Sequence, residues 1–265
     1  MKAKKNYRIE PFSSNRQMVA ASSAAASRFH TIHSLLEVDV TKPRRIIREH
    51  KNTSGESLSF TAYLVKCLAE TISEFPQYNA FQRGRQLIVM ENLTISVLVE
   101  RELEGGRVPE PIGIQKTQTK TFLEIQKEIR EAQFNQGEKL GSLSKTTWVR
   151  FIPGWLLGLF IRIASRNITL AERYGKTAVT AVGMYSSGRS WLVPLSSATI
   201  LMSVGGIHVE PVLNGDRLSE AEYLHLTLSF DHNIIDGAPA ARFCKHLESV
   251  ISSGDLLNNL PGNSV

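Results

Sequence analysis

The chain has 265 residues, and its 31 basic residues against 25 acidic ones give a formal net charge of +6. An apolar content of 42% with 21% charged residues is typical of a globular chain and excludes a wholly disordered one. The charge is mild for this length, and no basic helix carries interleaved aromatic residues, so we expect no nucleic-acid partner.

The chain begins with a predicted basic tail over residues 1–9, with lysines at positions 2, 4 and 5. No apolar run follows these lysines, so we expect no signal peptide and a cytoplasmic protein. Because no linker-like stretch interrupts the composition, we expect a single catalytic-type domain over residues 10–256 and a C-terminal tail over 257–265. Cys67 and Cys244 lie in apolar surroundings without a CxxC pair, which predicts buried reduced thiols.

Helices and strands alternate irregularly in the first half of the chain. Composition and periodicity predict a helix over 14–28, a strand over 31–40 and a short helix over 43–51. Apolar residues at helical spacing then predict a longer helix from Ser57 to Phe75, which Pro76 ends.

The second half contains more strands than helices. We predict a strand over 93–99, a turn over 104–106, a strand over 107–115 and an amphipathic helix over 121–134. Further along, we predict strands at 177–182, 199–205 and 224–231 and a last helix at 238–251. Without a regular βαβ alternation, this order favours an α+β layered domain, with a mixed central sheet and helices packed on it.

An apolar insertion at about 145–170 is centred on residues 148–168. It is too short to span a membrane and is interrupted by Arg150, Arg162 and Arg166. The favoured interpretation is a buried helix or a subunit contact. A membrane-surface helix and the wall of an acyl-chain pocket are the alternatives, and we expect no membrane contact.

The turn from Asp231 to Gly237 is the most informative segment. It follows an alternating run and precedes a helical one, so His232 lies where a strand ends and Asp236 where a helix begins. This arrangement suits a general base with a carboxylate nearby. The alternative is a structural turn in which His232 is solvated or in the core and Asp236 is only an N-cap.

His232-x-x-x-Asp236-Gly237 resembles the signature of the chloramphenicol acetyltransferase-like superfamily. The longer string at 226–238 resembles one branch, the catalytic domain of the dihydrolipoyl acyltransferase components of 2-oxo acid dehydrogenase complexes. That branch has an arginine where this chain has Asn233. The segment 177–185 resembles its Phe-Thr-Ile-Ser-Asn-Leu-Gly-Met-Phe, and Thr180 falls on the serine whose hydroxyl stabilises the oxyanion there. Weaker similarities lie at 11–20, 33–40 and 199–206.

The resemblance implies a free-standing acyltransferase of the chloramphenicol acetyltransferase-like fold. It would move an acyl group between a coenzyme A or lipoyl-type thioester and a small-molecule or carrier-bound acceptor. By resemblance, His232 is the general base, Thr180 the oxyanion donor, and Asp236 a structural residue paired with an arginine, for which Arg16 is our candidate. The resemblance also implies a homotrimer or a multiple of it, with His232 and Thr180 from neighbouring chains. We expect no lipoyl domain or covalent lipoyl group in this chain, and no cofactor-binding residue is assigned.

Two alternatives stay open at this point. His30-x-x-His33 could place two metal ligands together, but its pattern is strand-like and no third ligand is obvious, so we expect no metal. The alternative function is a non-catalytic oligomeric scaffold or binding subunit that retains the fold. Asn233, Thr180 and the apolar insertion permit this function, whereas His232 and Asp236 argue against it.

Overall fold

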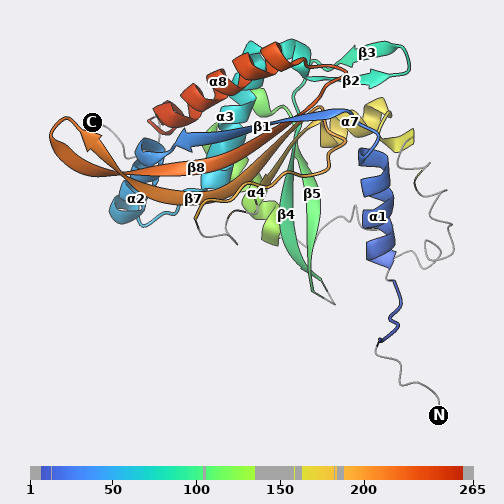
Figure 1. Ribbon diagram of the computed structural model, residues 1–265, viewed down its shortest axis with the longest axis horizontal. Coiled ribbons are helices and arrows are strands. Elements are labelled where there is room, and N and C mark those ends of the chain that lie inside the picture. Colours follow the sequence, from blue (N-terminus) through green and yellow to red (C-terminus); the bar gives the residue numbers. More distant parts are fainter. Residues whose placement is uncertain are drawn as a thin grey trace.

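The computed structural model describes residues 7–12, 14–103, 106–134, 158, 163–181, 183 and 188–258. Within these ranges the core is a six-stranded sheet in the order β1-β8-β7-β6-β4-β5 (Figure 1). Its strands are β1 (Thr31–Asp39), β4 (Ile95–Leu103), β5 (Gly106–Ile114), β6 (Thr177–Ala181), β7 (Ile200–Asn214) and β8 (Arg217–Asp231). The β4–β6 and β6–β7 pairs are parallel and the other pairs antiparallel, so the predicted mixed sheet is confirmed.

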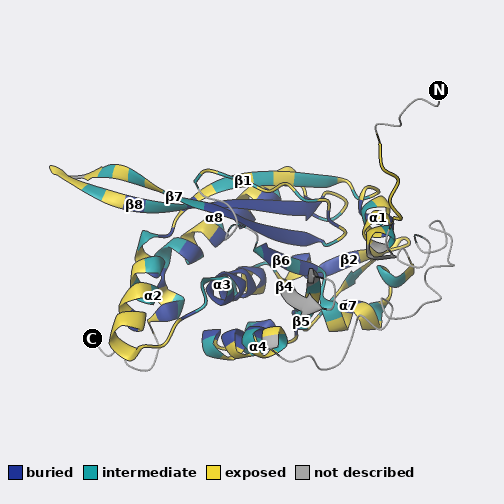
Figure 2. Cartoon of the chain, turned by 90° about the horizontal axis from the view of Figure 1, so that it is seen from below, coloured by how far each residue is buried: buried dark blue, intermediate teal, exposed yellow. Residues whose placement is uncertain are grey.

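Helices cover one face of this sheet (Figures 1 and 2). The α-helices are α1 (Ser14–Ala26), α2 (Thr41–Ser54), α3 (Phe60–Glu74), α4 (Phe122–Phe134), α7 (Ile168–Tyr174) and α8 (Gly237–Ser253), and short 3-10 turns cover Pro76–Tyr78, Thr117–Thr119 and Asp255–Leu257. Figure 2 shows α3 buried over most of its surface between the sheet and its neighbours. The sheet face toward the helices is mostly apolar, and its side chains include Val38, Leu226, Leu228, Phe230, Met202, Val179 and Val97.

Most predicted elements agree with these bounds to within a few residues, and the differences lie at the start of α3, at an extra hairpin and in strands β7 and β8. Ser59, not Ser57, caps α3, since its hydroxyl accepts a hydrogen bond from the Ala62 amide at 3.2 Å. A hairpin of β2 (Ala80–Arg83) and β3 (Gln86–Val89) was not predicted. Its two-residue loop contains Gly84 at φ 62°, a conformation that glycine adopts at low cost.

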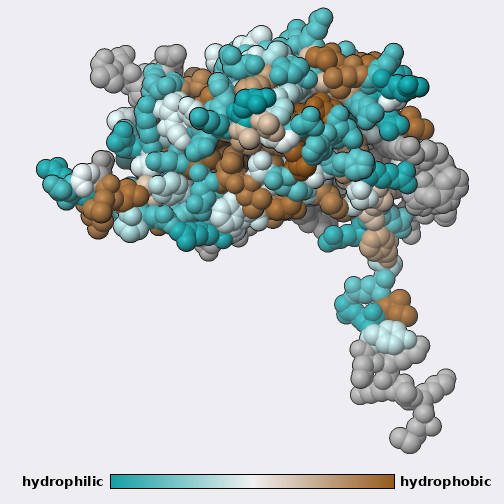
Figure 3. Space-filling model, turned by 45° about the horizontal axis from the view of Figure 1, so that its top comes forward, coloured by the Kyte–Doolittle hydropathy of each residue, from teal (hydrophilic) through white to brown (hydrophobic). Residues whose placement is uncertain are grey.

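Strands β7 and β8 are much longer than predicted. They pair from Asn214 and Arg217 back to the sheet, across a loop in which Gly215 has φ 62°. The hairpin therefore projects beyond the helices (Figure 1). Apolar side chains lie at its tip, where Leu213 is 78% exposed and Leu218 is 73% exposed (Figure 3).

The predicted insertion lies mostly outside the described residues. The part that is described includes the exposed Ile163 and the start of α7, where the Asn167 side chain caps the helix by accepting from the Leu170 amide at 3.1 Å. Most of the two predicted tails and of the predicted turn at 104–106 also falls outside the described residues. Within the described ranges, no helix has the length and apolar character needed to cross a membrane.

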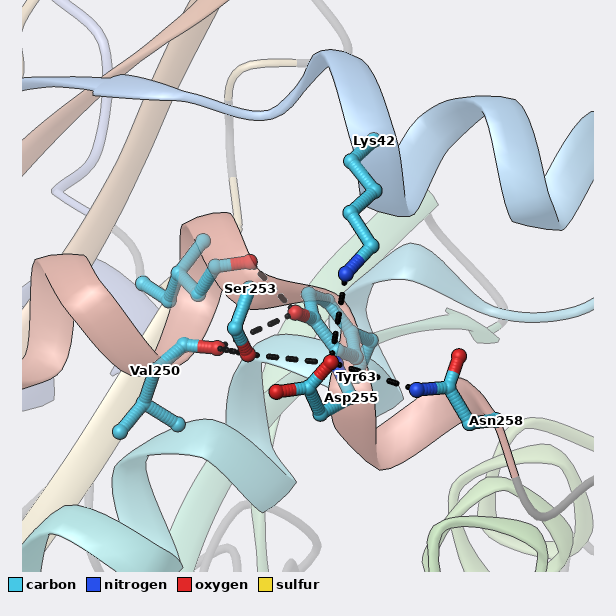
Figure 4. Close-up of polar contacts among 7 residues, drawn as sticks. Lys42, Tyr63, Val250, Ser253, Asp255 and Asn258 are labelled. Carbon is cyan, nitrogen blue, oxygen red and sulfur yellow. Dashed lines mark hydrogen bonds and ion pairs between the residues drawn. The ribbon is translucent and has the colours of Figure 1, made fainter.

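Polar contacts fix the C-terminal end of α8 to α2 and α3 (Figure 4). The Tyr63 hydroxyl of α3 donates to the Ile251 carbonyl at 2.5 Å, and the Lys42 ammonium of α2 pairs with Asp255 at 3.2 Å. These contacts hold the helix whose opposite end follows the His232 turn. The fold therefore fixes that turn from both sides, through strand β8 and helix α8.

Candidate active site

The His232 turn joins β8 to α8 within five residues. The amides of Ile234 and Ile235 both donate to the Asp231 carbonyl at 3.0 Å, which closes the turn. The His232 amide donates to the His30 carbonyl at 2.8 Å, so the turn is also tied to the start of β1. Ile235 is fully buried and anchors the turn in the core. The predicted strand-to-helix placement of His232 and Asp236 is confirmed.

The His232 and Asp236 side chains face each other at the surface. His232 Nδ1 lies 3.4 Å from Asp236 Oδ1, and the two side chains are 44% and 80% exposed. Asp236 occupies the N-cap position of α8, but its side chain makes no capping hydrogen bond. Its carboxylate is therefore available to accept from Nδ1–H. In that tautomer the Nε2 atom of His232 carries a lone pair, as a general base requires.

Asn233 stands where the acyltransferase signature has an arginine, and it makes hydrogen bonds within the turn. Its amide and its Nδ2 donate to Asp231 Oδ1 at 3.1 and 3.0 Å. Its Oδ1 lies 3.3 Å from His30 Nδ1. Asn233 thus bridges the end of β8 and the residue before β1. This role is structural, and all of its contacts lie within one chain.

Thr180 lies on the sheet face opposite the helices. It is 8% exposed and pairs in register with Ser203 of β7, which pairs with Thr227 of β8. Residues in register share a face, so these three hydroxyls form one row across the sheet. The hydroxyl oxygens of Ser203 and Thr227 are buried and have no hydrogen-bond partner among the described residues.

The chain just after Thr180 requires glycine. A Cβ on Gly183 would lie 1.6 Å from the carbonyl oxygen of Gly205, an approach that no side chain permits. Gly183 falls in the segment that resembles the family's oxyanion strand. Its role here is steric, since it lets the chain that follows β6 pass close to the bulge in β7.

One chain does not bring Thr180 and His232 together. Thr180 lies two strands from β8, level with Thr227, and His232 lies five residues beyond Thr227. With strand spacings of ~4.8 Å and a rise of ~3.4 Å per residue, the two Cα atoms are about 20 Å apart. Arg16 lies exposed on α1, and its pairing with Asp236 stays a prediction.

A ring cluster on the polar face was not predicted. Trp191 stacks on the fully buried His225 at 4.0 Å, and His225 stacks on His208 at 4.7 Å. Glu37 of β1 reaches His225 Nε2 at 3.2 Å. Burial, followed by the proximity of His208, lowers the pKa of His225. These residues are far apart in sequence, and no local motif could have united them.

The ring cluster also contains a possible ligand set for a metal ion. Ligand atoms of Glu37, His208 and His225 lie within 4.8 Å of one another. However, the Ser190 amide donates to His225 Nδ1 at 2.9 Å, so a neutral His225 carries its proton on Nε2, facing Glu37. A metal-bound histidine instead donates from its other nitrogen. The bond from Ser190 therefore argues against His225 as a metal ligand, although His208 Nδ1, His208 Nε2 and His225 Nε2 are buried without a hydrogen-bond partner among the described residues. The predicted pair His30 and His33 binds separate partners, Asn233 and Ser229.

Comparison with known proteins decides the family. The model of the family "2-oxoacid dehydrogenases acyltransferase (catalytic domain)" matches residues 4–144 and 161–258. The chain belongs to this acyltransferase catalytic-domain family. The resemblance carried by the His232 and Thr180 segments is thus confirmed, and the unmatched stretch between the two matched ranges lies inside the predicted insertion.

Relatives of this acyltransferase family match most of the chain. The lipoamide acyltransferase component of the branched-chain alpha-keto acid dehydrogenase complex of Bacillus subtilis (strain 168) is 26% identical over 243 residues, which cover 89% of this chain and 50% of the relative. The chain thus spans about half the length of the curated relatives it matches.

Two solved structures share the fold. The cubic core of the pyruvate dehydrogenase multienzyme complex gives a TM-score of 0.68 at 20% identity and covers 97% of both chains. The dihydrolipoamide acetyltransferase of Azotobacter vinelandii gives 0.70 at 18% identity, covering 95% of this chain and 94% of the other. That structure was solved to investigate a serine, a histidine and an asparagine in the enzyme's catalytic mechanism, the last two separated by the same spacing as His232 and Asp236.

Proposed function

We propose that this chain transfers an acyl group between a coenzyme A or lipoyl-type thioester and a small-molecule or carrier-bound acceptor. His232 is the general base that takes the proton from the attacking thiol, hydroxyl or amine. Thr180 donates its hydroxyl hydrogen to the oxyanion that forms at the thioester carbonyl. Asp236 orients the imidazole.

The geometry of the His232 turn carries this proposal. A carboxylate at 3.4 Å from Nδ1 favours the tautomer whose Nε2 is unprotonated, and partial exposure leaves that nitrogen accessible. The Asp236 side chain makes no capping hydrogen bond to α8, so its position beside His232 is not explained by helix capping. The comparison with the Azotobacter vinelandii enzyme adds that a relative of the same fold was studied for a histidine in catalysis.

The separation of His232 from Thr180 supports a site shared between chains. About 20 Å is too far for one substrate carbonyl to touch both side chains of one chain. A second copy must therefore supply one of them, as in the homotrimer that we propose.

The direct test is an acyl-transfer assay with acetyl-CoA and a panel of thiols, amines and alcohols, including dihydrolipoamide, that measures release of free thiol. We expect His232→Ala to lower turnover by about 10²–10⁴-fold while the variant stays folded. Equal rates for the parent and His232→Ala with every acceptor would indicate the scaffold function instead. His33→Ala is the matched control, because His33 lies in the same sheet and is bonded to Ser229.

Mixed oligomers test the shared site. His232→Ala and Thr180→Val chains are each expected to be inactive, but co-refolded one to one they would form intact sites from one chain's histidine and another's threonine. Random assembly makes about a quarter of the sites intact. Recovery toward that level supports the shared site, whereas a mixture as inactive as its components would show that each site lies within one chain.

A further inference from the structure

A pocket lies beside the His232 turn. Its volume is ≈ 560 Å³, and it is bounded by α1, the β2 strand and the edge of the sheet where β6 and β7 begin and β8 ends. Asp231 and Asn233, the two neighbours of His232, line it, but His232 does not. The pocket also contains Lys176, the residue before β6.

Lys176 lies in this pocket without an acidic partner among the described residues. Its ammonium donates to the Ser165 carbonyl and lies 4.8 Å from the centre of the Phe81 ring. The pocket's charged side chains are Arg28 and Arg166, both exposed, and Asp231, whose Oδ1 accepts from Asn233. Burial lowers the pKa of Lys176 to about 8. The carbonyl and the ring favour the charged amine, but they do not offset its lost hydration.

Lys66 shows what a paired buried lysine looks like in the same fold. It is only 9% exposed, and its ammonium lies 2.5 Å from the carboxylate of Glu70, one helical turn away. Lys66 therefore matches Lys176 in side-chain type and partial burial, but a carboxylate engages its ammonium.

We propose that Lys176 is an acylation site of this chain, modified directly by acyl thioesters that enter the pocket. The neutral Nζ attacks the thioester carbonyl, an N–C bond forms, the C–S bond breaks, and the amine proton ends on the departing thiol. The product is an amide on Lys176 and a free thiol, with no oxidant, reductant or metal. Arg28 and Arg166 at the rim attract anionic thioesters such as those of coenzyme A. This reaction does not depend on His232.

The protonation state sets the expected rate. Near pH 7, an amine of pKa about 8 is neutral in about one molecule in ten, whereas an ordinary lysine is neutral in about one in 3,000. A less basic amine is also a weaker nucleophile, which offsets part of this advantage. We therefore expect Lys176 to acylate about tenfold or more faster than exposed lysines such as Lys127.

The test incubates the whole folded protein with acetyl-CoA, and separately with S-acetyl-N-acetylcysteamine, and follows each lysine by peptide mass spectrometry from pH 6 to 10. We expect the rate at Lys176 to level off above about pH 8, while the rate at Lys127 keeps rising and Lys66 stays unmodified. The preference for Lys176 should vanish in urea. A rate at Lys176 equal to that at Lys127 at pH 7, or without a plateau, would overturn the proposal.

A second arm separates this inference from the proposed function. In His232→Ala, the modification of Lys176 should continue at the parent rate, whether or not turnover is lost. If His232→Ala abolishes acylation of Lys176, the acyl group passes through the His232 site and direct attack by the lysine is wrong. If Lys176 is acylated but parent and His232→Ala turn over no acceptor, the lysine site stands and the transferase proposal fails.

Discussion

The two faces of the central sheet have opposite chemistry. The face toward α3, α4 and α8 is lined by aliphatic and aromatic side chains in one continuous core. The other face carries a row of hydroxyls at Thr180, Ser203 and Thr227 and the buried imidazole of His225, two residues from Thr227. The first face is buried mostly by apolar groups, with Thr177 as a polar exception, whereas the second face combines buried polar side chains with exposed ones such as Leu35.

This difference separates what folds the chain from what we propose acts on substrate. Apolar side chains stabilise the fold wherever they pack against one another, and packing within this one chain is enough to stabilise the apolar face. A buried hydroxyl without a partner is costly, so the hydroxyls of Ser203 and Thr227 lower the stability of the single chain.

The largest effect is expected on the apolar face. Phe230 is fully buried and meets Phe243 of α8 edge to face at 5.7 Å. Phe230→Ala should lower the free energy of unfolding by about 3–5 kcal/mol, measured by urea denaturation, because it leaves a cavity in the core. Leu35→Ala on the opposite face, where Leu35 is 52% exposed, should change it by less than about 0.5 kcal/mol. Similar losses for the two variants would mean that the faces do not differ as described.

A substitution at Thr180 tests whether the polar face serves chemistry. Thr180→Val keeps the shape and removes the hydroxyl, so turnover should fall about 10²–10³-fold with little change in stability. Thr180→Ser keeps the hydroxyl and should stay within about tenfold of the parent enzyme. The measurement is kcat with saturating acetyl-CoA and the best acceptor. A valine variant as active as the serine variant contradicts the oxyanion role.

The apolar face explains why most of the fold could be predicted. The spacing of apolar residues shows which side of an element is buried. This spacing predicts the strand at 224–231 from its alternation and helix α3 from its helical period. The β2–β3 hairpin and the long β7–β8 extension were missed although Gly84 and Gly215 mark their turns. Their outer residues are exposed, so burial leaves a weaker pattern in them.

The candidate site was predictable only where it is local. His232 and Asp236 lie four residues apart, and a short motif can show such a pair. The contacts of Trp191 with His225, and of Lys176 with Phe81, join distant segments through strand register. No periodicity encodes such contacts. The role of Asn233 could not be predicted from the sequence either, because it depends on a contact with His30 near the other end of the chain.

The smallest effect is expected at Thr227. Its hydroxyl is buried without a partner, so Thr227→Val should leave the free energy of unfolding of the dilute protein unchanged or raise it by up to about 1 kcal/mol. Thr71 of α3 is the matched control, since it is equally buried but donates to the Cys67 carbonyl at 2.9 Å. Thr71→Val should cost about 1 kcal/mol. An equal cost for the two variants would mean that the Thr227 hydroxyl has a hydrogen-bond partner.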